Sequence, residues 1–258
     1  MLYHLKTAAC RIFIITLAFG LFSCNQLPTE ADAIKLNEMG INLMNEGKYE
    51  QAIASFKEAI QNSRLNTNSK GNIYRNMALA YHEQTIIDSA VHYSTLAAKC
   101  FKKNSYDYLV NMAYVDILVG KTGIAKSKLL KAETMNSEDM AVNNILGLIY
   151  LGDYGEEFTD LDKALRYNKK AYEINGSRGT EDILARNYYE LGEYENAELH
   201  YDHVYSKSPD KVVYALNTGM TKYKLKKISD AEVLFRKVIT MDSSYKETIE
   251  NFKGNNPQ

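Results

Sequence analysis

The chain has 258 residues, of which 45% are hydrophobic and 24% are charged, a balance typical of a folded protein and not of a disordered one. Its 31 Lys and Arg against 32 Asp and Glu give a formal charge of -1, which excludes the basic excess that nucleic-acid binding requires. Three Cys are too few for a disulfide framework or a Cys-rich zinc module, and only 3 Pro and 14 Gly favour long helices over short strands.

The first 23 residues have the features of a secretory signal. A basic start precedes the apolar run of residues 12–22, which is shorter than a membrane-spanning helix. The run leads into Leu21-Phe22-Ser23-Cys24, which resembles the bacterial lipoprotein box. The resemblance implies that residues 1–23 are removed and that Cys24 is lipidated, with residues 24–32 as a tether. An ordinary signal peptide or an uncleaved anchor helix are the alternatives.

Lipidation of Cys24 would tether the protein to a membrane without spanning it, because each buried methylene of the acyl chains contributes roughly 0.8 kcal/mol. The expected location is therefore the bacterial cell envelope. The outer membrane is the favoured membrane, and the sequence does not indicate whether the protein faces the periplasm or the cell surface.

Beyond the tether, one pattern occurs six times. An alanine recurs every 33 to 39 residues, and a second small or β-branched residue follows each alanine after seven residues. A Gly or Ala also precedes it by twelve residues in five of the six copies. The central alanines are Ala52, Ala90, Ala125, Ala164, Ala197 and Ala231. Because seven residues make two helical turns, the small residues share one helix face and predict closely packed antiparallel helices.

This pattern resembles the tetratricopeptide repeat, in which a Gly and a Tyr mark the turn into the second helix, as at Gly47-Lys48-Tyr49 and Gly192-Glu193-Tyr194. The resemblance implies an all-α, right-handed superhelix (solenoid) of about six antiparallel helix pairs. The expected repeats are residues 33–66, 71–104, 106–139, 140–178, 178–211 and 212–245, followed by a short cap and tail at 246–258. The fourth repeat holds five extra residues and is similar to the Sel1-type repeat.

Motifs for catalysis and cofactor binding are absent from the sequence, which has no phosphate-binding loop, no nucleophile elbow and no His-Glu-x-x-His. The protein is therefore expected not to be an enzyme and to need no cofactor. His200 and His203 could share a metal, but a tight site needs three or four ligands, so they are interpreted as a surface pair. The acidic cluster of Asp153, Glu156, Glu157, Asp160 and Asp162 lacks calcium-loop spacing and is interpreted as a solvated turn.

The first helix of each pair is expected to line a concave groove, because residues three or four apart on those helices face the same side. The mixture of aromatic, aliphatic and amide side chains on that side fits an extended peptide or a helix of another protein. The predicted partner-binding residues are Asn37, Ile41, Arg75, Asn76, Leu79, His82, Asn111, Tyr114, Asn144, Leu148, Arg186, Tyr189, Asn217, Met220 and Tyr223.

The sequence thus predicts a lipid-anchored scaffold that binds a protein or peptide partner in its groove at the cell envelope. The alternative is a glycan- or nutrient-binding lipoprotein of an uptake system, since groove tyrosines can stack on sugar rings. The absence of Trp weighs against a glycan ligand.

Overall fold

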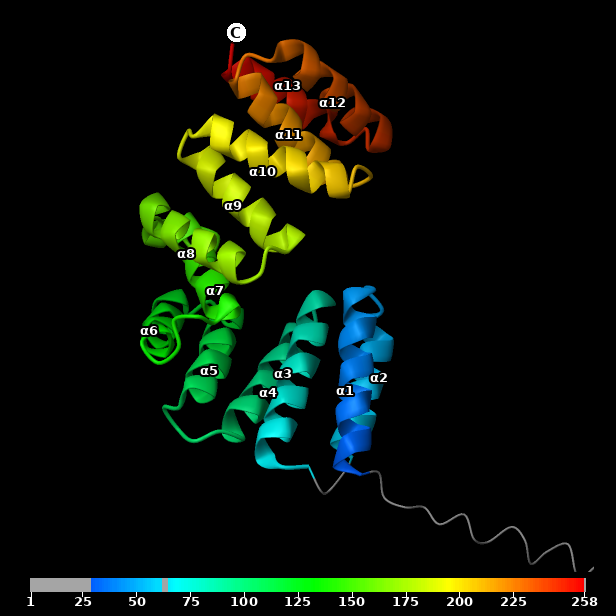
Figure 1. Cartoon of the computed structure of the whole chain (residues 1–258), viewed down its shortest axis with the longest axis vertical. Coiled ribbons are helices and arrows are strands. Elements are labelled where there is room, and N and C mark those ends of the chain that lie inside the picture. Colours follow the sequence, from blue (N-terminus) through cyan, green and yellow to red (C-terminus); the bar gives the residue numbers. More distant parts are fainter. Residues whose placement is uncertain (1–28, 62–64, 258) are drawn as a thin grey trace, which may run out of the picture.

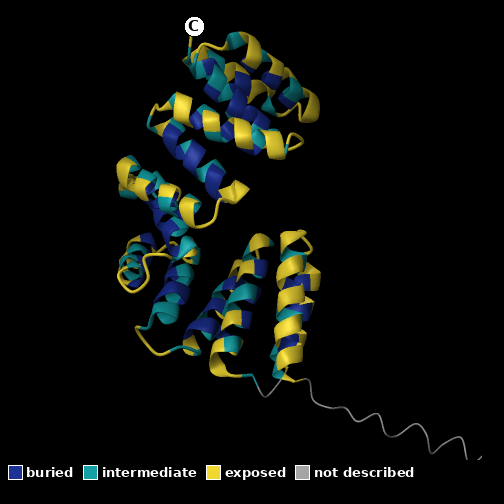
Figure 2. Ribbon diagram, in the orientation of Figure 1, coloured by how far each residue is buried: buried dark blue, intermediate teal, exposed yellow. Residues whose placement is uncertain are grey.

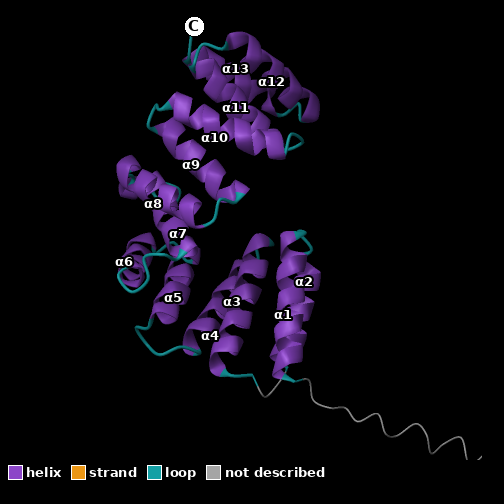
Figure 3. Cartoon of the chain, in the orientation of Figure 1, coloured by secondary structure: helices purple, strands orange, loops and turns teal. Residues whose placement is uncertain are grey.

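The computed structural model describes residues 29–61 and 65–257, and within them Figure 3 shows helices and loops without a strand. Thirteen α-helices and one short 3-10 helix make up this part of the chain. The helices are α1 (Glu30–Asn45), α2 (Tyr49–Ile60), α3 (Thr67–Glu83), α4 (Ile87–Lys99), α5 (Tyr106–Leu118), α6 (Thr122–Glu133), α7 (Met140–Leu151), η1 (Glu156–Phe158), α8 (Leu161–Ile174), α9 (Arg178–Glu190), α10 (Tyr194–Lys207), α11 (Val212–Lys224), α12 (Ile228–Met241) and α13 (Tyr245–Asn255).

Consecutive helices pack as antiparallel pairs, from α1 with α2 to α11 with α12, and each pair packs on the next. The pairs follow one another along an arc, with α13 against the last pair (Figure 1). The predicted all-α superhelix of six helix pairs is therefore confirmed.

The small-residue columns form the interior of the stack, as the sequence predicted. All six central alanines are fully buried, and the residues seven positions later are at most 1% exposed. In Figure 2 the buried residues follow the faces where helices meet, and exposed residues cover the opposite faces. The helices approach closely because these positions carry no bulky side chain.

The small residue in the first helix of each pair allows an even closer approach of the two helices, because it is a buried glycine in three of the pairs, at Gly40, Gly147 and Gly219. A Cβ added to Gly219 would lie 2.9 Å from Cε1 of the Phe235 ring, and one added to Gly40 would lie 2.7 Å from Cδ1 of Phe56. Phe56 and Phe235 are at most 1% exposed, so each ring occupies the space left by the missing methyl group. Glycine at these positions is thus a packing requirement.

The extra residues of the fourth repeat attach this repeat to the one before it. The Thr122 hydroxyl at the start of α6 donates a 2.9 Å hydrogen bond to the Tyr154 carbonyl. The Lys126 ammonium lies 4.6 Å from the centre of the Phe158 ring, a cation–π contact. The inserted loop therefore packs on α6, and the interpretation as a simple solvated turn was incomplete.

Two members of the acidic cluster in this loop have structural partners. The Asp160 carboxylate accepts a 3.1 Å bond from the Lys163 backbone N–H and so caps α8. The Asp153 carboxylate pairs with Arg186 at 2.5 Å. Glu156, Glu157 and Asp162 are exposed, as expected of a solvated turn.

Candidate partner-binding groove

The first helices of the six pairs are α1, α3, α5, α7, α9 and α11, and the surface that they share is called the inner face here. The helices α1 and α3 contact each other directly, as do α7 and α9, although each belongs to a different pair. The Asn76 side-chain amide donates a 2.9 Å hydrogen bond to Asn37 Oδ1 across the α1–α3 contact. In Figure 1 α6 and α8 lie on the outer side of the arc.

The N-terminal part of the inner face presents apolar side chains to solvent. Ile41 on α1 and Leu79 on α3 are 38% and 37% exposed. Both follow the small residue of their repeat by one position, where the sequence predicted groove residues. Arg75 is half-buried on the same helix as Leu79, and its guanidinium donates a 3.2 Å bond to Asn72 Oδ1.

The middle of the inner face holds polar atoms that are buried without a protein partner. The His82 and Tyr114 rings meet edge to face, 5.7 Å apart, and the Tyr114 hydroxyl has no hydrogen bond. Burial raises the pKa of Tyr114 well above its ordinary value. Asn144 Oδ1 on α7 is also buried and unpaired, and Leu148 lies half-buried one turn later on the same helix. Such atoms need a water molecule or a ligand to complete their hydrogen bonds.

Two of the predicted groove residues are interior residues, which corrects their assignment. Asn111 is 2% exposed, and its side-chain amide donates a 2.7 Å bond to the Asp107 carbonyl of its own helix. Tyr223 is 7% exposed, and its ring lies 5.5 Å from that of Phe252 on α13. Neither side chain is available to a partner in this structure.

Four other predicted residues come together in one pocket between α9 and α11, called the α9–α11 pocket here. It has a volume of about 260 Å³. Its lining residues are Arg186, Tyr189, Glu190, Tyr201, Asn217 and Met220. The sequence did not indicate Glu190 and Tyr201 as groove residues. Tyr201 is one of the large residues that follow the central alanine by four positions, and it is 3% exposed. Its sequence position therefore indicated a core residue and gave no sign that it also lines a pocket.

Two charged side chains on α9 differ in whether they have a partner within the protein. The Arg186 guanidinium is paired with Asp153, whereas Asp182, one helical turn earlier on α9, has a buried Oδ1 without a hydrogen bond. Burial raises the pKa of Asp182, although the nearby Arg186 charge opposes this shift. Burial also raises the pKa of Tyr189 to about 12, so both it and Tyr201 are hydrogen-bonding phenols at neutral pH.

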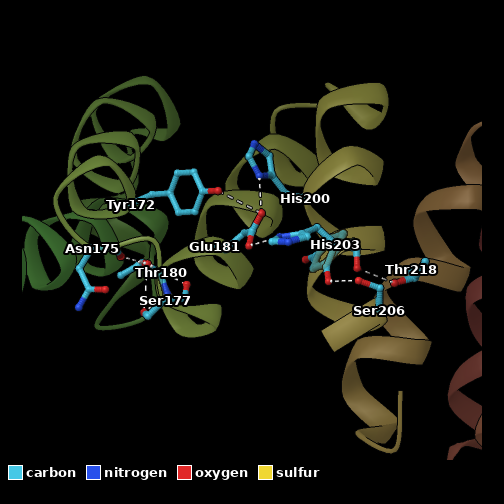
Figure 4. A network of polar contacts seen from close by, with 10 residues as sticks. Tyr172, Asn175, Ser177, Thr180, Glu181, His200, His203, Ser206 and Thr218 are labelled. Atoms are coloured by element: carbon cyan, nitrogen blue, oxygen red, sulfur yellow. Dashed lines mark hydrogen bonds and ion pairs between the residues drawn. The ribbon is translucent and has the colours of Figure 1, made fainter. Parts of the chain in front are cut away.

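A second polar cluster lies between helices α8, α9 and α10, and Figure 4 shows its side chains converging on the Glu181 carboxylate. Glu181 is only 3% exposed. Its Oε1 lies 3.1 Å from His200 Nδ1 and 3.3 Å from the Tyr172 hydroxyl, and its Oε2 lies 2.7 Å from His203 Nδ1. His203 is half exposed, but His200 is mostly buried, so the interpretation of a surface pair is corrected.

This Glu181 cluster joins three helices of two successive repeats and satisfies a buried carboxylate, which is a structural task. Among the described residues, no group of three or more His, Cys, Asp or Glu side chains has an arrangement that could hold a metal ion. Likewise, none of the helices in the described ranges combines the length and hydrophobicity needed to cross a bilayer. Cys24 and the apolar run before it lie outside the described residues.

A family model described as a domain of unknown function, DUF6340, matches residues 38–119. No curated protein matches the chain. The fold is similar to a thermophilic tetratricopeptide protein, TTC0263 of Thermus thermophilus, with a TM-score of 0.57 and 17% identity over 73% of this chain and 98% of that one.

Two further solved structures have a similar fold. The structure of PilF from Pseudomonas aeruginosa matches with a TM-score of 0.61 and 16% identity over 86% of this chain and 99% of that one. A chain of the Cut9–Hcn1 hetero-tetramer matches with a TM-score of 0.68 and 16% identity over 86% of this chain and 42% of that one. In its fold, the chain is thus a tetratricopeptide-like repeat protein.

Proposed function

We propose that the protein is a non-catalytic scaffold that binds a protein partner along its inner face at a bacterial envelope membrane. The observation that carries the proposal is the inner face itself. It combines exposed Ile41 and Leu79, the unpaired polar atoms of Tyr114 and Asn144, and the α9–α11 pocket. Apolar contacts with a few convergent polar groups are what a polypeptide ligand requires.

The solved structures give this proposal limited support, since their identities of 16% and 17% establish the fold alone. One of them is described as a hetero-tetramer of Cut9 with Hcn1, in which a chain of this fold is assembled with a second protein. The inner face of the present chain supports the same kind of use through its own side chains.

Leu79→Asp is expected to weaken capture of the partner at least tenfold, because it replaces an apolar contact at the interface by a carboxylate that binding would have to desolvate. Leu79 is 37% exposed on α3, so the fold should tolerate the change. The control is Ile124→Asp, which places the same charge on α6, where Ile124 is 52% exposed. The measurement is quantitative recovery of cross-linked partner from cells that produce each variant.

Equal recovery of one partner with Leu79→Asp and Ile124→Asp would refute binding along the inner face. Recovery of polysaccharide in place of protein, sensitive to Leu79→Asp, would replace the proposal by a glycan-binding one.

We also propose that lipidated Cys24 attaches the scaffold to the membrane. Cys24→Ser is expected to move the protein from the membrane fraction to the soluble fraction, because it removes the only acyl chains that hold it. Cys100→Ser is the matched control, since this half-buried thiol lies within the repeats. Fractionation of both variants tests the anchor, and a Cys24→Ser protein that stays with the membrane would contradict it.

A further inference from the structure

The α9–α11 pocket is lined by polar side chains that form no hydrogen bond with the rest of the described protein. Tyr189, Tyr201 and Asn217 line the pocket, and no described residue forms a hydrogen bond with their side chains. Asp182 is not a lining residue, but its buried Oδ1, one turn before Arg186 on α9, also has no hydrogen bond. The three lining residues come from α9, α10 and α11 and surround one cavity of about 260 Å³. A purely apolar side chain would fill this volume but leave the polar groups unpaired.

The charges around the pocket determine which ligand charge it favours. Arg186 is neutralised by Asp153, while Glu190 forms no ion pair with any described residue. The charge of Glu190 reaches both tyrosines, since it raises the pKa of Tyr189 and of Tyr201, and that of Asp182 also raises the pKa of Tyr201. The Arg186 charge acts in the opposite direction, since it lowers the pKa of Asp182 and of Tyr201. Glu190 is therefore the lining carboxylate that has no ion pair and lies close to the aromatic rings.

Lys224, a cation on α11, is engaged outside the cavity. Lys224 follows Met220 by one turn on α11, but its ammonium is bonded to Asn256 Oδ1 and lies 5.6 Å from the centre of the Tyr194 ring. It is not among the lining residues. Two tyrosine rings beside the Glu190 carboxylate, which has no ion pair, form a suitable environment for a cation.

We propose that the α9–α11 pocket binds a basic side chain, Lys or Arg, of the partner polypeptide. The cation lies between the Tyr189 ring and the Glu190 carboxylate, within the field of Asp182, and its N–H groups donate to the hydroxyl of Tyr201 and the amide oxygen of Asn217. This inference rests on the proposed function, in which the groove binds a polypeptide. It adds the chemistry of one anchor residue in that partner.

The test uses the purified protein with ¹³C-methyl methionine, in which the half-buried Met220 methyl reports on the pocket and is assigned with Met220→Leu. The probes are acetyl-Gly-Gly-X-Gly-Gly-amide peptides with X as Arg, Lys, Gln or Glu. The Arg and Lys peptides are expected to shift the Met220 signal in a saturable way, at concentrations where the Gln and Glu peptides do not.

Glu190→Gln and Asp182→Asn are each expected to weaken the Arg and Lys peptides about fivefold, since each removes one favourable charge. The matched control is Asp230→Asn, which removes an exposed carboxylate from α12 and should leave binding unchanged. Because burial raises the pKa of Asp182 above its usual 3.8, acidification should weaken binding from a higher pH than for an ordinary aspartate. Asp182→Asn should remove this part of the pH dependence.

A Met220 response that is equal for Arg, Gln and Glu peptides, or absent for all four, would overturn the basic-anchor proposal. That failure is distinct from failure of the proposed function, because Leu79 lies on α3, far along the arc from the pocket (Figure 1). A Leu79→Asp defect in partner capture without any cation preference at Met220 would keep the scaffold and reject its basic anchor.

Discussion

Gly147→Ala is expected to lower the free energy of unfolding by about 3 kcal/mol, because the added methyl group has no space. A Cβ at this position would lie 2.7 Å from Asn168 Cγ. Asn168 is 1% exposed, and its side-chain amide donates a 2.8 Å bond to Asn187 Oδ1. Asn187 in turn donates a 3.1 Å bond to the Leu161 carbonyl, so moving Asn168 would break a buried polar chain.

The matched control is Gly123→Ala on α6, where a Cβ would lie 3.7 Å from the nearest side-chain atom, Phe158 Cζ. This substitution should leave stability unchanged or raise it slightly, since Ala favours helix over Gly. Urea unfolding followed by circular dichroism measures both variants. A Gly147→Ala protein as stable as the parent would show that α7 and α8 do not approach as closely as the structure indicates.

The double substitution of His200→Ala with His203→Ala is expected to destabilise the protein by about 2 kcal/mol. It would leave the Glu181 carboxylate, which is 3% exposed, with the Tyr172 hydroxyl as its remaining side-chain partner. A buried charge that loses its partners retains its desolvation cost, and this cost dominates the effect.

Adding Glu181→Met to the double His variant is expected to recover most of the lost stability, because it removes the unpaired charge while keeping a similar volume. His92→Ala serves as the control, since this exposed histidine on α4 contacts the Tyr93 ring and no carboxylate. Urea unfolding of the single, double and triple variants shows whether the histidines stabilise the protein as partners of the Glu181 charge or by packing alone. A triple variant that is no more stable than the double variant would mean that the histidines act by packing alone.

The fold could be predicted from the sequence because the same packing requirement recurs six times. One buried alanine is weak evidence, but small residues at matching positions in every repeat define which helix faces meet. The inserted loop of the fourth repeat was recognised from its length. Its attachment to α6 through Thr122 and Phe158 was not, because that contact depends on the path of the loop in three dimensions.

The groove was only partly predictable, because small rotations of a helix decide whether a residue faces its interior or its edge. Asn76, Asn111 and Asn217 all precede the small residue by two positions, yet Asn111 is buried, Asn76 bonds to Asn37 and Asn217 lines a pocket. Each residue turns the helix by about 100°. The position two before the small residue lies at the border of the inner face, because its side chain is buried in one repeat and lines a pocket in another.

Tyr223 and Glu181 show the influence of neighbouring elements. Tyr223 and Tyr189 both follow their small residue by four positions, but Phe252 of α13 packs on Tyr223 while Tyr189 faces the pocket. Glu181 gave no signal, because its partners His200 and His203 come from the next helix and an isolated Glu in a helix is ordinarily exposed.

Photo-cross-linking in producing cells tests directly whether a partner binds along the inner face. A benzophenone amino acid is placed at Leu79 or Tyr189 on the inner face, and at Ile124 or Leu199 on α6 and α10, where these side chains are 52% and 68% exposed. Binding along the inner face should give an adduct with the same protein from Leu79 and Tyr189 and none from Ile124 or Leu199. Adducts confined to Ile124 and Leu199 would contradict it.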